Sequence, residues 1–331
     1  MSATANAMPQ AKPETTARVP ELDGIRGLAI LLVVMLHYVS DTSSGSMKFV
    51  EPIQWCFNLG WSGVDLFFVL SGFLIGGILL DVRESPVYFR TFYMRRLFRI
   101  MPLYYLWMIA FVAMVFFHWP PLPKPLTLAH ERLEFLPFYF LFLQNYVWAF
   151  HSIFGDFWLG TLWSLGIEEQ FYLVAPAVIR LFSRATLVRL LVGTVALGPL
   201  IRLIVYKYIS HSHGGVYVLT PCRADALALG MLIAVGWRSE KFRSWISLNR
   251  GYLLLAFWIL FAGVIALNEF FFGRLDFVTA IGGYSWLAFF YGSMLLVVLS
   301  NRKGTLAWIM RRKFLMELGR CPTAFTSSTT P

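Results

Sequence analysis

The amino-acid sequence predicts an all-α fold, a polytopic transmembrane helical bundle of about nine to ten spans or re-entrant helices. The first observation is composition: 58% of the 331 residues are hydrophobic and only 14% are charged, which is too apolar for a water-soluble domain. The second is that apolar stretches of about 20 residues, enough to cross about 30 Å of hydrocarbon, recur along almost the whole chain. We therefore expect the lipid bilayer to be the solvent.

Eight segments have the length and character of a membrane span. In chain order they are 25–40, 60–80, 100–118, 161–181, 187–208, 222–237, 252–270 and 277–300. Residues 1–20, before the first span, are rich in Ala, Thr and Pro and lack the apolar middle of a signal peptide. They are expected to form a disordered cytoplasmic tail.

Basic residues set the expected orientation, because Arg and Lys concentrate in cytoplasmic connectors. One group lies in the connector between the second and third spans, and three later groups lie in other connectors: Arg83, Arg90, Arg95, Arg96 and Arg99; Arg180, Arg184 and Arg189; Arg238, Lys241, Arg243 and Arg250; Arg302, Lys303, Arg311, Arg312 and Lys313. If 135–150 crossed the bilayer, the later groups would all lie outside. A re-entrant or interfacial segment keeps them inside, and we favour that interpretation.

Charge and cysteine content exclude two classes of function. The formal charge of +10 is spread over short connectors, which fits membrane topology and not a nucleic-acid-binding surface. Cys56, Cys222 and Cys321 form no CxxC pair and have no His at metal-ligand spacing. The sequence predicts neither a disulfide framework nor a metal site.

Ionisable residues inside spans are costly and therefore suggest function. In the first span Arg26 and His37 are separated by about three helical turns, so they share nearly the same face. His37 is a candidate base for a sugar hydroxyl, and the alternative is a histidine that hydrogen-bonds across helices. Asp23 is expected to form an ion pair with Arg26 at the helix entrance. Asp65, in the second span, is a candidate to orient His37.

Three further groups of polar residues stand out. Arg95, Arg96 and Arg99 lie before the third span, where guanidinium groups suit phosphate binding but the positive-inside rule also explains them. Glu168 and Glu169 lie within an apolar helix, and Glu168 is our candidate for the site. The third group is Arg223 and Asp225. They either bind an acceptor or neutralise neighbouring charges, and both interpretations stay open.

The expected topology divides these residues by depth. Arg96 and Arg99 fall on the inner side. The others fall in the outer half of the membrane: His37, Asp65, Glu168, Arg223 and Asp225. Such a division suits a donor from the cytoplasm and an acceptor outside.

Four ordered motifs carry a resemblance to a known family. They are LDGIRGLAILLVVMLHY, GVDLFFVLSGFLIGG, FYMRRLFRIMPLYY and LWSLGIEEQFYLVAP. In this order they resemble the membrane acyltransferase-3 family, whose members modify envelope polysaccharides and related acceptors. The resemblance covers roughly residues 20–319, and we expect a family domain over 21–319.

The resemblance implies a function and roles for particular residues. It implies transfer of an acyl group, expected to be acetyl, from cytoplasmic acetyl-CoA to a hydroxyl of an envelope carbohydrate or lipid-linked acceptor in the bacterial inner membrane. Its arginine motifs match Arg26, Arg96 and Arg99 as donor-binding residues. His37 becomes a general base or transient acyl carrier, with Glu168 and Asp65 in the catalytic group. Arg223 and Asp225 match a late pair expected to bind the acceptor.

The C-terminal residues 320–331 depart from the family pattern. Members continue from a Leu-Gly turn into a last aromatic helix, whereas this chain reads LMELGRCPTAFTSSTTP. We hypothesise a frameshift after Cys321, so that the last family helix is missing. The coding DNA tests this, because the neighbouring frame must encode the aromatic helix.

Two other functions compete with the enzyme interpretation. Buried ionisable residues also mark the pathway of a transporter or flippase for a polar envelope precursor. A non-catalytic assembly subunit is the third alternative. The sequence specifies neither the acceptor, nor the acyl chain length, nor the oligomeric state.

Overall fold

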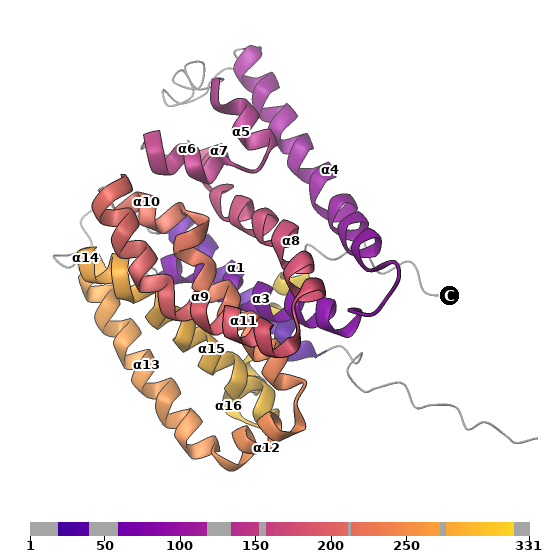
Figure 1. Ribbon diagram of the computed structural model, residues 1–331. Helices are drawn as coiled ribbons and strands as arrows, with labels where there is room; N and C mark the ends of the chain where they lie inside the picture. Colours follow the sequence, from indigo (N-terminus) through magenta and orange to yellow (C-terminus); the bar gives the residue numbers. More distant parts are fainter. Residues whose placement is uncertain are drawn as a thin grey trace, which may run out of the picture.

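The computed structural model describes residues 19–39, 59–117, 134–151, 157–210, 213–271 and 276–320. Every regular element in these ranges is helical, which confirms the predicted fold class. The expected spans coincide with long helices: α1 (Pro20–Val39), α3 (Gly63–Asp81), α4 (Tyr88–Phe116), α8 (Trp163–Leu181), α9 (Arg184–Val205), α11 (Thr220–Trp237), α13 (Arg250–Phe271) and α15 (Tyr284–Ser300). Figure 1 shows α3, α9, α11, α13 and α15 gathered in one bundle, with α4 at its edge.

Shorter helices connect or flank these spans. They are the 3-10 helix η3 (Leu59–Ser62), α5 (Leu136–Phe140), α6 (Gln144–His151), α7 (Phe157–Gly160), the π-helix η5 (Tyr206–Ser210), α10 (His213–Val218), α12 (Glu240–Leu248), α14 (Asp276–Val278), the π-helix η6 (Thr279–Gly283), α16 (Thr305–Met310) and α17 (Lys313–Arg320). The ambiguous segment 135–150 therefore forms two helices of 5 and 8 residues. At 1.5 Å per residue neither covers the roughly 30 Å of hydrocarbon, which supports the non-crossing interpretation.

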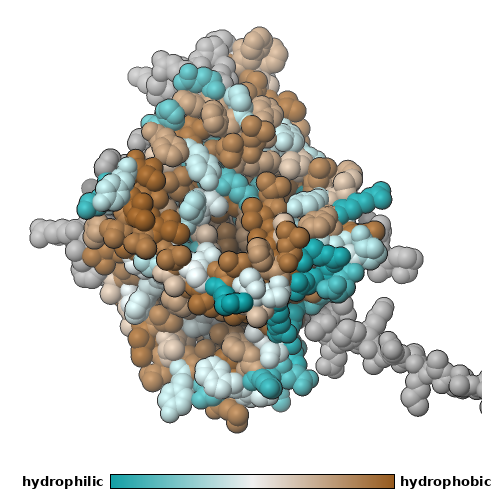
Figure 2. Space-filling view, in the orientation of Figure 1, coloured by the Kyte–Doolittle hydropathy of each residue, from teal (hydrophilic) through white to brown (hydrophobic). Residues whose placement is uncertain are grey.

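Burial separates central from peripheral spans. Five helices of the described chain are long and apolar enough to cross a membrane, judged by length and composition. In those containing α3 and α15, 72% of the most apolar window is buried, against 22% in those of α4 and α9 and 11% in that of α13. The last three consequently offer their apolar side chains to lipid. Hydrophobic residues cover much of the face seen in Figure 2.

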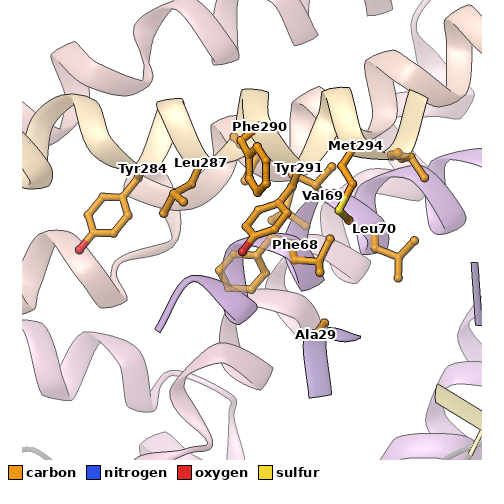
Figure 3. Close-up of a cluster of buried hydrophobic side chains, with 14 of the residues drawn as sticks. Ala29, Phe68, Val69, Leu70, Tyr284, Leu287, Phe290, Tyr291 and Met294 are labelled. Carbon is orange, nitrogen blue, oxygen red and sulfur yellow. The ribbon is translucent and has the colours of Figure 1, made fainter. Parts of the chain in front are cut away.

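Small residues let the central helices approach closely. A Cβ on Gly72 of α3 would lie 2.1 Å from the carbonyl oxygen of Leu227, and one on Gly230 of α11 would lie 2.1 Å from that of Val69. Backbone contact of this kind is how membrane helices pack without large side chains between them. Gly72 therefore permits close packing of α3 against α11. Figure 3 shows Phe68, Val69 and Leu70 of α3 beside large side chains of α15, among them Phe290, Tyr291 and Met294.

The basic connectors meet at one end of the bundle. Arg83, after α3, donates a 2.7 Å hydrogen bond to the carbonyl oxygen of Phe182, after α8. Arg238, after α11, forms a 2.6 Å ion pair with Asp81 at the end of α3. Hydrophilic residues gather in Figure 2 on the lower right, the side on which α4 begins in Figure 1. This arrangement agrees with the parity expected when 135–150 does not cross.

The start of α1 is held at the same end by α16 and α17. Arg320 of α17 lies 3.3 Å from Asp23, and Arg311 at the end of α16 lies 3.4 Å from Glu21. The predicted pairing of Asp23 with Arg26 is therefore wrong. A long-range partner is available because the C-terminal helices fold back against α1, which leaves the guanidinium of Arg26 for another purpose.

Candidate functional site

The position of α4 decides where its arginines lie. The sequence predicted a span beginning near residue 100, with Arg96 and Arg99 in the connector before it. The helix instead begins at Tyr88, so both arginines lie within it, above its second turn. They reach the level of Glu168 on α8, and the predicted separation of Glu168 from these arginines is wrong.

The arginine–glutamate cluster consists of Arg26 from α1, Arg96 and Arg99 from α4, and Glu168 from α8. All three guanidinium groups lie within electrostatic reach of the Glu168 carboxylate. Arg99 is also within reach of the other two arginines. Glu168 is 7% exposed, so these charges interact in an environment that screens them less than water does.

The arginines of this cluster outnumber its acidic partners. Within the described ranges, none of the three guanidinium groups forms a hydrogen bond or an ion pair. Glu169, the neighbour of Glu168, is also within electrostatic reach of Arg96. Three positive and two negative charges leave a surplus of one positive charge on half-buried arginines, which favours an anionic ligand.

Tyr172 connects three helices inside the cluster. Its hydroxyl donates a 2.9 Å hydrogen bond to Oε2 of Glu168, one turn earlier on α8. The same hydroxyl lies 3.1 Å from Oγ of Ser71 on α3. The guanidinium carbon of Arg96 lies 4.7 Å from the centre of the tyrosine ring. The other carboxylate oxygen of Glu168, Oε1, has no hydrogen-bond partner in the described chain.

Four tyrosine hydroxyls attach α4 to its neighbours. Tyr88 and Tyr93 donate to the carbonyl oxygens of Pro176 and Leu173 on α8, over 3.1 and 2.9 Å. Tyr104 and Tyr105 donate to the carbonyl oxygens of two α5 residues, Tyr139 and Phe140, over 2.7 and 3.2 Å. These bonds set the level of α4, and of its two arginines, against α8.

The predicted catalytic base is only partly placed. Position 37 belongs to α1, but the His37 side chain lies outside the described part of the molecule. Asp65, the predicted partner of His37, forms a 2.8 Å ion pair with Arg223 of α11. Its carboxylate is thus engaged by an arginine, and whether it also orients His37 stays a prediction.

Arg223 lies in an aromatic cage. Its guanidinium carbon is 4.0 Å from the ring centre of Tyr284, 5.3 Å from that of Tyr217 and 5.7 Å from that of Phe68. The side chain is 0% exposed. Cation–π contacts and one carboxylate compensate the burial of the charge.

The charge of Asp225 is paired with Arg202, a residue that sequence reasoning missed. Arg202 lies on α9 and its Nη1 is 2.9 Å from Oδ2 of Asp225. The guanidinium also donates to the carbonyl oxygens of Cys222 and Ile281 and to Ser285. We call this pair and the Asp65–Arg223 pair the paired charges. Of the two interpretations of Arg223 and Asp225, this geometry favours neutralisation of neighbouring charges.

A buried amide network was also missed, and it folds 134–151 back onto the bundle. Gln170 of α8 donates a 2.9 Å bond to Asn145 of α6, whose own amide donates a 3.0 Å bond to Thr220 of α11. Gln144 donates a 2.7 Å bond to the carbonyl oxygen of Leu162. The signal was available, since Gln144 and Asn145 adjoin each other within an apolar segment and buried amides need partners.

The site combines guanidinium groups with a buried carboxylate. Guanidinium groups hold phosphates by paired hydrogen bonds, and Glu168 offers one oxygen for a ligand. The described residues contain no group of three or more His, Cys, Asp or Glu side chains placed to hold a metal ion. Fold and site together define a polytopic helical membrane protein with three half-buried arginines beside a buried glutamate.

The chain belongs to the acyltransferase-3 family, whose acyltransferase domain matches residues 19–321. It is 32% identical over 233 residues to a protein of Listeria monocytogenes named peptidoglycan O-acetyltransferase OatA, covering 66% of this chain and 34% of the relative. A putative peptidoglycan O-acetyltransferase of Bacillus subtilis, YrhL, is 31% identical over 243 residues, covering 68% and 34%. The O-acetyltransferase OatA of Staphylococcus aureus is 30% identical over 229 residues, covering 66% and 35%.

The chain spans about a third of the length of these curated relatives. Comparison with solved structures found no match.

Proposed function

We propose that this chain is an integral membrane O-acetyltransferase. It transfers an acetyl group from cytoplasmic acetyl-CoA to a hydroxyl of an envelope carbohydrate or lipid-linked acceptor. The observation that carries the proposal is the arginine–glutamate cluster, in which guanidinium groups from α1 and α4 surround Glu168 without forming an ion pair among the described residues. The family and the names of the relatives support the same reaction.

The arginines of the cluster are proposed to bind the acyl donor, acetyl-CoA. Coenzyme A carries a pyrophosphate and a ribose phosphate, and bidentate guanidinium contacts suit both groups. Arg26, Arg96 and Arg99 are the residues proposed to hold them. Their surplus positive charge would contribute to the affinity for these phosphates.

The reaction breaks the thioester C–S bond of acetyl-CoA and forms a C–O bond to the acceptor. The hydroxyl proton leaves the acceptor and the coenzyme A thiol is released. His37 is proposed to take that proton or to carry the acetyl group between donor and acceptor. Glu168 and Asp65 complete the proposed catalytic group.

The orientation proposed is an N-terminus in the cytoplasm of a bacterial cell, with the protein in its inner membrane. The gathering of basic connectors at one end of the bundle supports this, since such connectors remain on the cytoplasmic side. The donor then enters from that end. Peptidoglycan is the first acceptor to test, because two of the relatives carry it in their names.

The experiment uses purified protein in proteoliposomes with acetyl-CoA and de-O-acetylated peptidoglycan fragments. The expected result is release of coenzyme A together with acetylation of the fragment. Each acetylated fragment should gain about 42 Da, because an acetyl group carried by the cofactor replaces one hydrogen. His37→Ala should abolish transfer while membrane insertion persists. Transport of the fragments without consumption of acetyl-CoA would overturn the proposal and favour a flippase.

A further inference from the structure

We propose that Tyr172 is a positioning residue of the acetyltransferase site, acting with its hydroxyl on Glu168 and with its ring on Arg96. The inference rests on the proposed function and adds a residue to its machinery. Tyr172 lies within the fourth motif, LWSLGIEEQFYLVAP, in which only Glu168 was given a role.

The hydroxyl fixes one half of the carboxylate. Tyr172 and Glu168 are four residues apart on α8, and at that spacing their side chains stand one above the other. The phenol donates to Oε2 over 2.9 Å, and Ser71 of α3 lies 3.1 Å from the phenol oxygen. With Oε2 held, Oε1 is the oxygen left for the arginines or a ligand.

The ring positions the other charge. The guanidinium carbon of Arg96 lies 4.7 Å from the ring centre of Tyr172 and 5.8 Å from that of Phe92. A cation held over a ring face keeps its hydrogen-bond donors directed to the sides. Arg96 can therefore donate to a phosphate while it remains in contact with Tyr172.

Burial makes this geometry rigid. Tyr172 is 5% exposed, Ser71 7% and Glu168 7%. Rotation of the ring would remove the hydrogen bond to Glu168 and the support of Arg96 together, in a place where water cannot replace them. One side chain thus couples the carboxylate and the donor-binding arginine, and its two parts can be removed separately.

Two substitutions separate these parts. Tyr172→Phe removes the hydroxyl and keeps the ring, so we expect kcat for acetyl transfer to fall about 10- to 100-fold, the loss of one hydrogen bond to a charged group. The KM for acetyl-CoA should change less than about threefold, because the ring still supports Arg96. Tyr172→Leu removes both parts, so it should lower kcat and also raise KM and the Kd for coenzyme A.

The matched control is Tyr291→Phe. Tyr291 of α15 also joins two elements through its hydroxyl, which lies 2.6 Å from Oγ of Ser62 in η3. Its removal tests the cost of losing one interhelical tyrosine hydroxyl outside the arginine–glutamate cluster. We expect kcat and KM to stay at the values of the natural protein.

The measurements are initial rates in proteoliposomes and titration of the purified variants with coenzyme A. Equal kcat and KM in Tyr172→Phe and Tyr291→Phe would overturn the inference. Should Tyr172→Phe fail to fold, Ser71→Ala tests the same hydrogen-bond chain, and an unchanged kcat there would also overturn it. Failure of the natural protein to consume acetyl-CoA would contradict the proposed function itself, a result distinct from either outcome.

Discussion

The two groups of buried charges in this protein are built in opposite ways. Among the paired charges each arginine meets one aspartate, at 2.8 Å for Arg223 and 2.9 Å for Arg202. In the arginine–glutamate cluster three arginines share the neighbourhood of Glu168 and none forms an ion pair in the described chain. Paired charges join helices, whereas the half-buried arginines of the cluster keep hydrogen-bond donors that a ligand can use. The comparison separates charges that hold the bundle together from charges proposed to bind a donor.

The largest effect should come from breaking a paired charge. Arg202→Leu leaves Asp225 buried at 2% exposure without its arginine, and removal of one partner of a buried ion pair costs about 3–5 kcal/mol. We expect loss of monodisperse protein in detergent. Size-exclusion chromatography and thermal unfolding measure this loss.

The control for this prediction is the double variant Arg202→Leu with Asp225→Leu. Removing both charges leaves no lone ion, so part of the stability should return. If Arg202→Leu alone were as stable as the natural protein, the structural assignment of this pair would be wrong.

Substitutions in the arginine–glutamate cluster should spare folding and lower affinity. Arg96→Gln and Arg99→Gln break no ion pair, but each removes a charged donor proposed to bind phosphate, worth about 1.5–3 kcal/mol or roughly 10- to 150-fold in affinity. Titration with coenzyme A measures the affinity, and thermal unfolding measures the stability. Arg95→Gln is the control, because Arg95 is exposed on the same helix. A stability loss equal to that of Arg202→Leu would remove the distinction between the two groups.

Packing glycines should give the next largest effect. A Cβ on Gly27 of α1 would lie 1.9 Å from the carbonyl oxygen of Leu315 on α17. Gly27→Ala therefore forces α1 away from α17, at a cost of about 1–3 kcal/mol for overpacking. Because α1 carries Arg26, affinity for coenzyme A should fall too.

Gly193→Ala on α9 is the matched control, since a Cβ there meets nothing within 4 Å. It should leave stability unchanged or raise it by about 0.5–1 kcal/mol through helix propensity. Equal unfolding temperatures for the two alanine variants would contradict close contact between α1 and α17.

The smallest effect is expected for an exposed pair. Lys313 and Glu317 of α17 lie 3.8 Å apart, and their side chains are 87% and 61% exposed. Exposed pairs at this helical spacing contribute about 0.3–0.5 kcal/mol. Glu317→Gln should hardly change the unfolding temperature. A loss of stability comparable to that of Arg202→Leu would show that burial does not determine how much an ion pair contributes.

The sequence predicted spans better than it predicted partners. Runs of apolar residues fix where helices lie, and α9 and α13 begin and end within a few residues of the expected positions. Partners depend on which helices become neighbours. Asp23 was assigned to Arg26 because the two are close in sequence, yet its partner is Arg320, at the far end of the described chain.

The site was predicted in its residue types more than in its arrangement. Arg26, Arg96, Arg99 and Glu168 were all singled out, and the structure brings them together. Their convergence depends on α4 beginning at Tyr88, which hydropathy obscures because basic residues occupy its first turns. Arg202 met the criterion of an ionisable residue inside a span and should have been included.

The tyrosine hydroxyls of α4 have a consequence for how reliably the site can assemble. Only 22% of the apolar window of this helix is buried, so lipid would permit it to slide along its own axis. A slip of one turn, about 5.4 Å, would break the hydrogen bonds that Tyr88, Tyr93, Tyr104 and Tyr105 donate, at several kcal/mol for each hydroxyl left unmatched within the hydrocarbon. The four tyrosine hydroxyls therefore fix the axial position of α4, and with it the depth at which the guanidinium groups lie near the Glu168 carboxylate.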